Sequence, residues 1–314
     1  MCKISELDTH LGSPLARLLP TLPTFRLAHL SDPHLPPPQF GNGWRDILSK
    51  RSLSRIAWLR KRHDHRPAIL AAIVADLKAH APDHIALTGD LTNFSTPEEV
   101  AAAAAWLRTL GDPAMLTISP GNHDALTGAR GAARFAPWQD WLGDETGGFP
   151  HVRLRGPVAI VNLCSALPTA PHLAQGELGA DQLSRLGPIL QGLGDQGLYR
   201  VVMLHHPITR GTVSARKSLV DAKILRGLLE THGAELVLHG HGHEAATATT
   251  PGPRGPIPVL GVPSASSAGL RNHPAARWHG FEIAVTPDGF TTRVVSRGLG
   301  PDGMVGELGR YILV

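Results

Sequence analysis

The chain has 314 residues with a formal net charge of +4, and hydrophobic residues make up 42% of it. This length fits one large α/β domain or two small ones, and the apolar share is ample for a buried core. No stretch approaches the ~18 consecutive apolar residues of a transmembrane helix, and the polar start of the chain lacks the apolar core of a secretory signal. The two cysteines, Cys2 and Cys164, form no disulfide framework, so we expect a cytoplasmic protein.

The apolar pattern alternates between strands and helices over most of the chain. It predicts helices at 67–80, 97–110, 181–193 and 218–232, and strands at 25–30, 84–88, 115–118, 158–163, 199–204 and 235–239. A capping box, Thr96-Pro97-Glu98-Glu99, opens the second helix. Short strands follow at 256–262, 280–286 and 290–296, the last two flanking a turn. We therefore predict an α/β fold, a four-layer αββα sandwich in which two mixed sheets pack face to face with helices outside.

Five short segments, each ending an apolar stretch, carry Asp, Asn or His side chains. They are Asp32-Pro33-His34, Gly89-Asp90, Gly121-Asn122-His123-Asp124, His205-His206-Pro207 and Gly240-His241-Gly242-His243. The carboxyl ends of strands in an open α/β sheet are where sites are built, so we expect these segments to meet at one rim.

Each segment alone also has a simpler interpretation. Asp, Pro and Gly end strands through their own backbone preferences, and a His-Gly-His run can be a flexible tract with incidental metal affinity. Five such endings in succession, each after its own predicted strand, favour a shared site for two metal ions. Imidazole and carboxylate together suit Mn, Fe or Zn rather than Mg or Ca.

In this order the segments resemble the motifs of the calcineurin-like metallophosphoesterase superfamily, which are D-x-H, GD, GNH followed by Asp or Glu, H, and GHxH. The resemblance covers about residues 25–245. It implies a phosphoesterase with two divalent transition-metal ions, which hydrolyses a phosphodiester, or a phosphomonoester or pyrophosphate, through a hydroxide that bridges the ions.

The resemblance also implies a role for each site residue. One ion would be bound by Asp32, His34, Asp90 and His243, and the other by Asp90, Asn122, His205 and His241. The catalytic residues would be His123, which faces the substrate phosphate, and the bridging Asp90. We expect Asn93 and His206 to join His123 in binding the substrate.

One departure narrows the subfamily. Protein serine/threonine phosphatases extend the second motif to GDxxDRG, but Asn93 replaces the second Asp here and the Arg is absent. The form found here is more similar to the bacterial phosphodiesterase branch, which includes class III cyclic-nucleotide phosphodiesterases and glycerophosphodiesterases. The alternatives are a hydrolase of lipid-linked or nucleotide pyrophosphates of the UDP-diacylglucosamine type, a nuclease of the superfamily, and a non-catalytic metal-binding scaffold.

We divide the chain into an N-terminal extension (1–24), a metallophosphoesterase domain (25–298) with a basic insertion (36–66), and a C-terminal tail (299–314). The insertion holds eight of the 30 Lys and Arg residues between positions 45 and 66. It is either a solvated helical insertion over a sheet edge or an amphipathic cap near the metals. A cap at 44–66 would recruit a small anionic phosphate ester, a lipid or the inner membrane face. We expect no dedicated nucleic-acid-binding domain.

Overall fold

The computed structural model describes residues 24–38, 63–126, 132–144, 148–170, 172–270 and 273–313, and these form two six-stranded sheets. The first sheet contains β1 (Thr24–Leu30), β2 (His84–Leu87), β3 (Leu116–Ile118), β10 (Arg277–Thr286), β11 (Gly289–Leu299) and β12 (Val305–Leu313), in the order β12-β11-β10-β1-β2-β3. The second contains β4 (His151–Arg155), β5 (Val158–Asn162), β6 (Tyr199–Met203), β7 (Leu236–His239), β8 (Thr247–Thr250) and β9 (Ile257–Gly261), in the order β4-β5-β6-β7-β9-β8. Both sheets are mixed. In the first, β1, β2 and β3 pair in parallel and the pairs from β1 to β12 are antiparallel. In the second, β5, β6, β7 and β9 pair in parallel, and the edge strands β4 and β8 are antiparallel to their neighbours.

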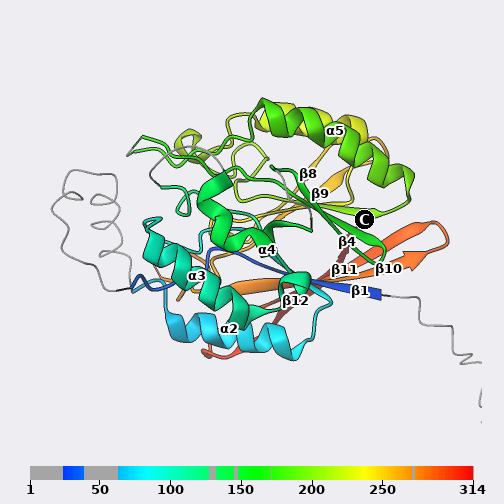
Figure 1. Cartoon of the computed structure of the whole chain (residues 1–314). Helices are drawn as coiled ribbons and strands as arrows, with labels where there is room; N and C mark the ends of the chain where they lie inside the picture. Colours follow the sequence, from blue (N-terminus) through cyan, green and yellow to red (C-terminus); the bar gives the residue numbers. More distant parts are fainter. Residues whose placement is uncertain are drawn as a thin grey trace, which may run out of the picture.

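Helices cover the outer face of each sheet (Figure 1). Residues of α2 (Pro67–Ala79), α3 (Pro97–Leu110) and the short α4 (Gln139–Leu142) share a buried cluster with β1, β2 and β3. Residues of α5 (Ala180–Asp195) and α6 (Ala222–His232) share another with strands of the second sheet. A third cluster lies between the two sheets. These three apolar layers confirm the predicted αββα sandwich.

The central strands are buried on both faces, and their side chains alternate between layers. In β6, Val201 and Met203 join the cluster between the sheets, whereas Val202 joins the cluster under the helices. β5 divides in the same way, with Ile160 between the sheets and Val161 under the helices. A strand covered on both sides reads as a continuous apolar run, and this is why the sequence predicts these central strands well.

Three strands escape prediction from the sequence: β4, β8 and β12. Each lies at the edge of its sheet. An edge strand has one open side, so polar and charged residues are tolerated and the apolar signal is weak. β8 shows this clearly, since its sequence is Thr-Ala-Thr-Thr. β12 lies within the segment 299–314 that the sequence analysis names a tail, and it pairs antiparallel with β11.

The helix predicted at 218–232 begins later, at Ala222. The residues before Ala222 bind the segment 176–179 instead. Leu219 forms a β-bridge with Gly176, and the Asp221 carboxylate accepts hydrogen bonds from the backbone N–H groups of Leu178 and Gly179. These contacts hold 218–221 outside the helix. The predicted buried thiol is correct, because Cys164 lies in the apolar cluster under α3.

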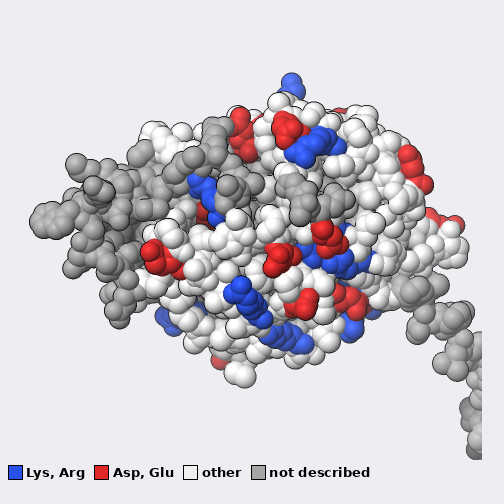
Figure 2. Space-filling view, viewed as in Figure 1, with Lys and Arg blue, Asp and Glu red and all other residues white. Residues whose placement is uncertain are grey.

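Most of the basic insertion (36–66) falls on residues 39–62, which lie outside the described part of the chain, as do residues 1–23. The proposed cap and its lipid or membrane partner therefore stay predictions. On the face shown in Figure 2, the described Lys and Arg side chains are interspersed with Asp and Glu. Among the helices of the described residues, none is long and apolar enough to cross a membrane.

The capping box of α3 gives a test of local stability. The Thr96 side chain accepts a hydrogen bond from the Glu99 N–H at 3.1 Å, and the Glu99 carboxylate accepts one from the Thr96 N–H at 3.0 Å. Thr96→Ala leaves one of these donors without its partner, so the free energy of unfolding should fall by about 1 kcal/mol in a urea titration. Thr109→Ala, at the exposed far end of the same helix, serves as the control and should change it by no more than about 0.5 kcal/mol. Equal losses in both variants would contradict the capping role.

Candidate metal centre

The five predicted segments meet at the carboxyl ends of strands from both sheets. Three follow strands of the first sheet, since Asp32 and His34 come after β1, Asp90 after β2 and Asn122 after β3. Two follow the second sheet: His205 comes after β6, and His241 and His243 after β7. Their ligand atoms form overlapping groups within 4.8 Å, including Asp32–His34–Asp90 and Asp90–His205–His241. The site therefore spans the rim where the two sheets face each other.

Left-handed backbone conformation is concentrated at this rim. Asp32, His34, Asp90, His241 and His243 have φ angles of 51°, 42°, 54°, 64° and 55°. The remaining non-glycine residues with positive φ in the described chain are Ala81 and Ser95. Each such position costs on the order of 1–3 kcal/mol, so it persists only where the surroundings impose it. Five such residues in one site indicate that the surrounding structure forces an unfavourable backbone conformation in order to direct these side chains toward one another.

Two glycines allow the loops to approach this closely. A Cβ atom on Gly89, whose φ is +85°, would lie 2.6 Å from the Gly121 nitrogen and 2.8 Å from the His205 ring. A Cβ on Gly240 would lie 1.8 Å from the Ser31 hydroxyl and 2.5 Å from the Asp32 carboxylate. Larger residues at either position would push ligand-bearing loops apart.

The first cluster holds two imidazoles and two carboxylates. The Nε2 atoms of His34 and His243 are 3.3 Å apart, and His243 Nε2 is 3.2 Å from Asp32 Oδ1. His34 Nε2 is 3.9 Å from Asp90 Oδ2. The other Asp32 oxygen is fixed by hydrogen bonds from the Ser31 hydroxyl at 2.6 Å and the His241 N–H at 3.0 Å.

The second cluster shares Asp90 with the first. His205 Nε2 lies 3.1 Å from Asn122 Oδ1 and 3.3 Å from Asp90 Oδ2. The same Asp90 Oδ2 atom thus faces both His34 and His205. An oxygen between two groups of ligands is suited to bridge two cations.

The donor atoms fit bound cations. His205 Nδ1 donates to the Thr88 carbonyl at 2.6 Å, so its Nε2 points at the Asn122 and Asp90 oxygens and offers them a lone pair once its proton has left. Within the described chain, His241 Nε2 is buried and makes no hydrogen bond. Buried acceptors that converge without donors need a positive charge among them, and ligation by imidazole and carboxylate suits a transition metal.

The electrostatics of the site favour an ionised Asp90 and neutral imidazoles at His34 and His241, but a protonated imidazole at His205 as long as no cation is bound. Burial lowers the pKa of His34 and of His241 well below the usual value. Burial disfavours the charged form of Asp90, but the nearby imidazoles of His205 and His123 hold its pKa well below the usual value. Burial also disfavours the charged form of His205, yet the adjacent Asp90 carboxylate raises the pKa of His205 to about 9. A cation and this proton compete for the same nitrogen, so cation binding releases a proton.

His123 lies beside the two clusters without belonging to either set of ligands. Its backbone N–H donates to Asp90 Oδ1 at 2.8 Å, and its Nδ1 donates to the Asn93 carbonyl at 2.9 Å. The Asn93 side chain points elsewhere, because its amide donates to the Leu35 carbonyl at 2.7 Å. Asn93 therefore orients His123 through its backbone, while Leu35 holds its side-chain amide nitrogen, and the substrate contact of Asn93 stays a prediction. The sequence alone does not reveal this backbone contact.

Two further residues of the motifs, His206 and Asp124, are buried beside the ligands. His206 is fully buried, with Nδ1 2.7 Å from the Ser165 hydroxyl and Nε2 3.2 Å from the Ala174 carbonyl. Burial lowers its pKa to about 3, and its ring packs 4.4 Å from that of His241. This geometry favours a supporting role for His206 over the predicted substrate contact. Asp124 is buried too, and it accepts hydrogen bonds from the N–H groups of Gly121, Asp90 and Thr92.

A cavity of about 110 Å³ opens onto the clusters. Besides predicted residues, its lining includes residues that the sequence analysis does not assign to the site: Asp64, His65, Ala174, Lys217, Ser267 and His273. The run His63-Asp64-His65 has the composition of a metal-binding segment, and this signal is hidden in the sequence by the basic residues around it. A larger hollow of about 450 Å³ lies beside Arg200 and Glu235, whose charges pair with each other.

A family model for calcineurin-like phosphoesterases matches residues 25–245. The chain belongs to the calcineurin-like phosphoesterase family. It is therefore a metal-dependent hydrolase, and membership implies two divalent ions at this rim, where the donor atoms fit them.

Other comparisons agree with this family. A probable cyclic nucleotide phosphodiesterase of Synechococcus sp. is 29% identical over 227 residues, which cover 70% of this chain and 78% of the relative. This match supports the bacterial phosphodiesterase branch. A dimetal phosphatase from Danio rerio has a TM-score of 0.57 at 12% identity, covering 93% of this chain and 99% of that one. Purple acid phosphatase PPD1 from yellow lupin seeds has a TM-score of 0.54 at 12% identity, covering 93% and 54%. The two structures show a likeness of fold alone.

The shared carboxylate gives a direct test of the phosphoesterase site. Asp90→Ala should abolish retention of both ions after reconstitution with Mn²⁺ and dialysis, because both clusters lose an oxygen. Asp32→Ala should retain about one ion per chain, since Asp32 belongs to the first cluster only. Elemental analysis of the purified variants measures both outcomes. Asp195→Ala, which changes an exposed aspartate, is the matched control and should retain two ions per chain. Two retained ions in Asp90→Ala would show that Asp90 does not bridge them.

Proposed function

We propose that this metallophosphoesterase hydrolyses a phosphodiester. One arrangement carries the proposal: the two clusters share one Asp90 oxygen, while the other Asp90 oxygen accepts the His123 N–H and keeps that imidazole at the cavity. A reacting phosphate at the shared oxygen would lie within reach of both clusters and of His123. Phosphoryl transfer needs this combination of charge neutralisation and a proton donor.

When two divalent ions are bound, they neutralise phosphoryl charge and lower the pKa of a water molecule so that it can act as the nucleophile. Asp90 and Asp32 contribute negative charge that holds the ions, and Asn122 adds a neutral oxygen. His123 in its imidazolium form donates from Nε2 to the leaving oxygen, while Nδ1–H stays bonded to the Asn93 carbonyl.

The charges around the cavity favour a diester over a monoester. Among its described lining residues, Lys217 is the single Lys or Arg. A phosphomonoester carries up to two negative charges near neutral pH, whereas a diester carries one and needs less compensation. The similarity to a probable cyclic nucleotide phosphodiesterase supports the same choice. The scaffold alternative requires lost ligands, and all seven predicted ligand positions hold ligand-type residues.

Substrate class is tested with reconstituted Mn²⁺ protein and two aryl esters that share a leaving group. We expect kcat/KM to be at least tenfold higher for bis(p-nitrophenyl) phosphate than for p-nitrophenyl phosphate, and we expect a chelator to remove both activities. Preference for the monoester would contradict the diesterase assignment. Two bound ions with no hydrolysis of either ester would favour the scaffold.

The role of His123 is tested by His123→Ala. Loss of a general acid should lower kcat by about 10²–10⁴, while two ions are retained because His123 is outside both ligand sets. His80→Ala, a change of an exposed histidine at the end of α2, is the control and should leave kcat within twofold. Loss of ions in His123→Ala, to the extent seen in Asp90→Ala, would show that His123 is a ligand instead.

A further inference from the structure

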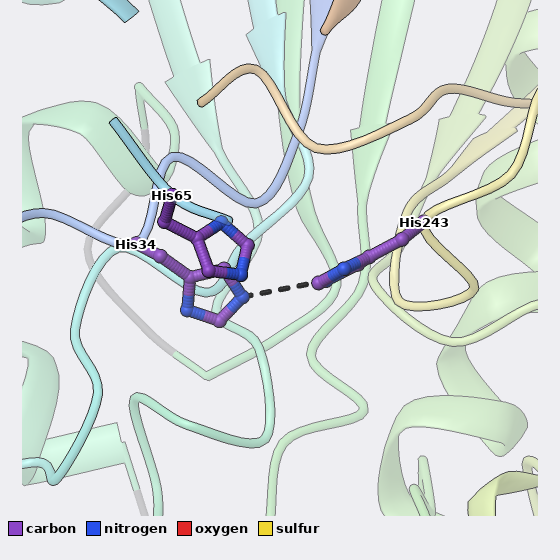
Figure 3. A group of neighbouring side chains, drawn as sticks. All are labelled: His34, His65 and His243. Carbon is purple, nitrogen blue, oxygen red and sulfur yellow. Dashed lines mark hydrogen bonds between the residues drawn. The ribbon is translucent and has the colours of Figure 1, made fainter. Parts of the chain in front are cut away.

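A third histidine approaches the first cluster from outside the five motifs. One ring nitrogen each of His34, His65 and His243 lie within 4.8 Å of one another. The rings of His65 and His34 are 4.5 Å apart, and those of His65 and His243 are 5.6 Å apart. In Figure 3 the His65 ring lies over that of His34, and both face His243. At metal–nitrogen distances of about 2.0–2.1 Å, ligand nitrogens on one ion lie roughly 3–4 Å apart, so a small movement brings all three onto one cation.

The backbone holds His65 in this position from both sides. His65 forms an antiparallel bridge with Ser267, and its neighbours are bonded to the same loop: Arg66 N–H donates to the Ser266 carbonyl at 2.9 Å, and Ala268 N–H donates to the Asp64 carbonyl at 2.7 Å. The helix α2 begins two residues later, at Pro67. His65 is thus placed by a helix start and a strand-like bridge, which are rigid supports.

A chain of hydroxyl groups orients the His65 ring. Its Nδ1 is 2.9 Å from the Ser266 hydroxyl, which is 3.2 Å from the Ser264 hydroxyl. Ser264 donates to the Asp32 carbonyl at 2.7 Å. A carbonyl can only accept, so the proton of Ser264 points to Asp32, and the chain then runs in one direction with Nδ1–H of His65 as its first donor. This places the His65 lone pair on Nε2, which is the form that binds a metal.

We propose that His65 is an additional protein ligand of the ion that His34 and His243 bind. The inference rests on the two-ion site of the proposed function, but it concerns ion affinity and not hydrolysis. The first ion then has five protein donors, while the second keeps four, one of them the neutral Asn122. With both ions bound, the five donors around the first would leave it fewer positions for a phosphoryl oxygen than the second has.

Ion affinity of the apoprotein tests the proposal. Titration with Mn²⁺ against a fluorescent chelator should resolve two sites, and His65→Ala should weaken one of them at least tenfold while the other stays within twofold. Substitution with Co²⁺ gives a spectroscopic measure, since the visible band of one ion should shift when an imidazole is lost. Added imidazole should restore both the affinity and the band in His65→Ala. His65→Gln, which retains an oxygen near the Nε2 position, should lose less affinity than His65→Ala.

Two variants separate ligation from positioning. His80→Ala removes a histidine from the opposite end of α2, about 20 Å away for 13 residues at 1.5 Å each, and should change neither site. Ser266→Ala removes the orienting hydroxyl, and its smaller loss should not respond to imidazole. Unchanged Mn²⁺ affinity in His65→Ala, with a raised KM for the diester, would make His65 a substrate contact and overturn the proposal. Equal weakening of both sites, or no rescue by imidazole, would also overturn it. Inactivity of the wild-type protein toward esters would refute the proposed function and leave this measurement intact.

Discussion

The site depends on one buried carboxylate that lies between the two sheets. Asp90 is only 2% exposed, and an ionised carboxylate in such surroundings is costly unless cations or donors surround it. Its Oδ1 accepts the His123 N–H, and its Oδ2 faces His34 on one side and His205 on the other. The polypeptide thus supplies the His123 N–H to one oxygen and the protonated His205 imidazole to the other, and a cation at Oδ2 would replace the proton of His205. The positive-φ backbone of the ligand residues and the close approach allowed by Gly89 and Gly240 hold the imidazoles near the Asp90 carboxylate.

The chain keeps this arrangement by hydrogen bonds that run between loops more than within them. Asp124 accepts from three N–H groups of the Asp90 and Gly121 loops, and the Thr88 carbonyl accepts from His205. These groups are buried, so breaking any one of them leaves a polar atom unsatisfied. The loops therefore have few alternative conformations. A preorganised set of acceptors lowers the reorganisation that ion binding would otherwise require.

The two ion sites differ in their surroundings. The first is bordered by His65 and the serines between β9 and β10, and the second by the buried pair His206 and Ser165. This difference is expected for a site built from two unlike sheet edges, because each edge contributes its own supporting residues.

The sequence by itself determined the central strands, the capped α3 and the ligand types at the strand ends. These are local properties: burial on both faces gives an apolar run, and Thr96 caps through contacts three residues away. Only the tertiary structure decided the strands β4, β8 and β12, the start of α6 at Ala222, the backbone contact of Asn93 and the position of His65. Each of these depends on a partner far along the chain, such as Ser266 for His65. The spacing of residues in the sequence does not reveal such contacts, because they form only when distant segments pack together in the fold.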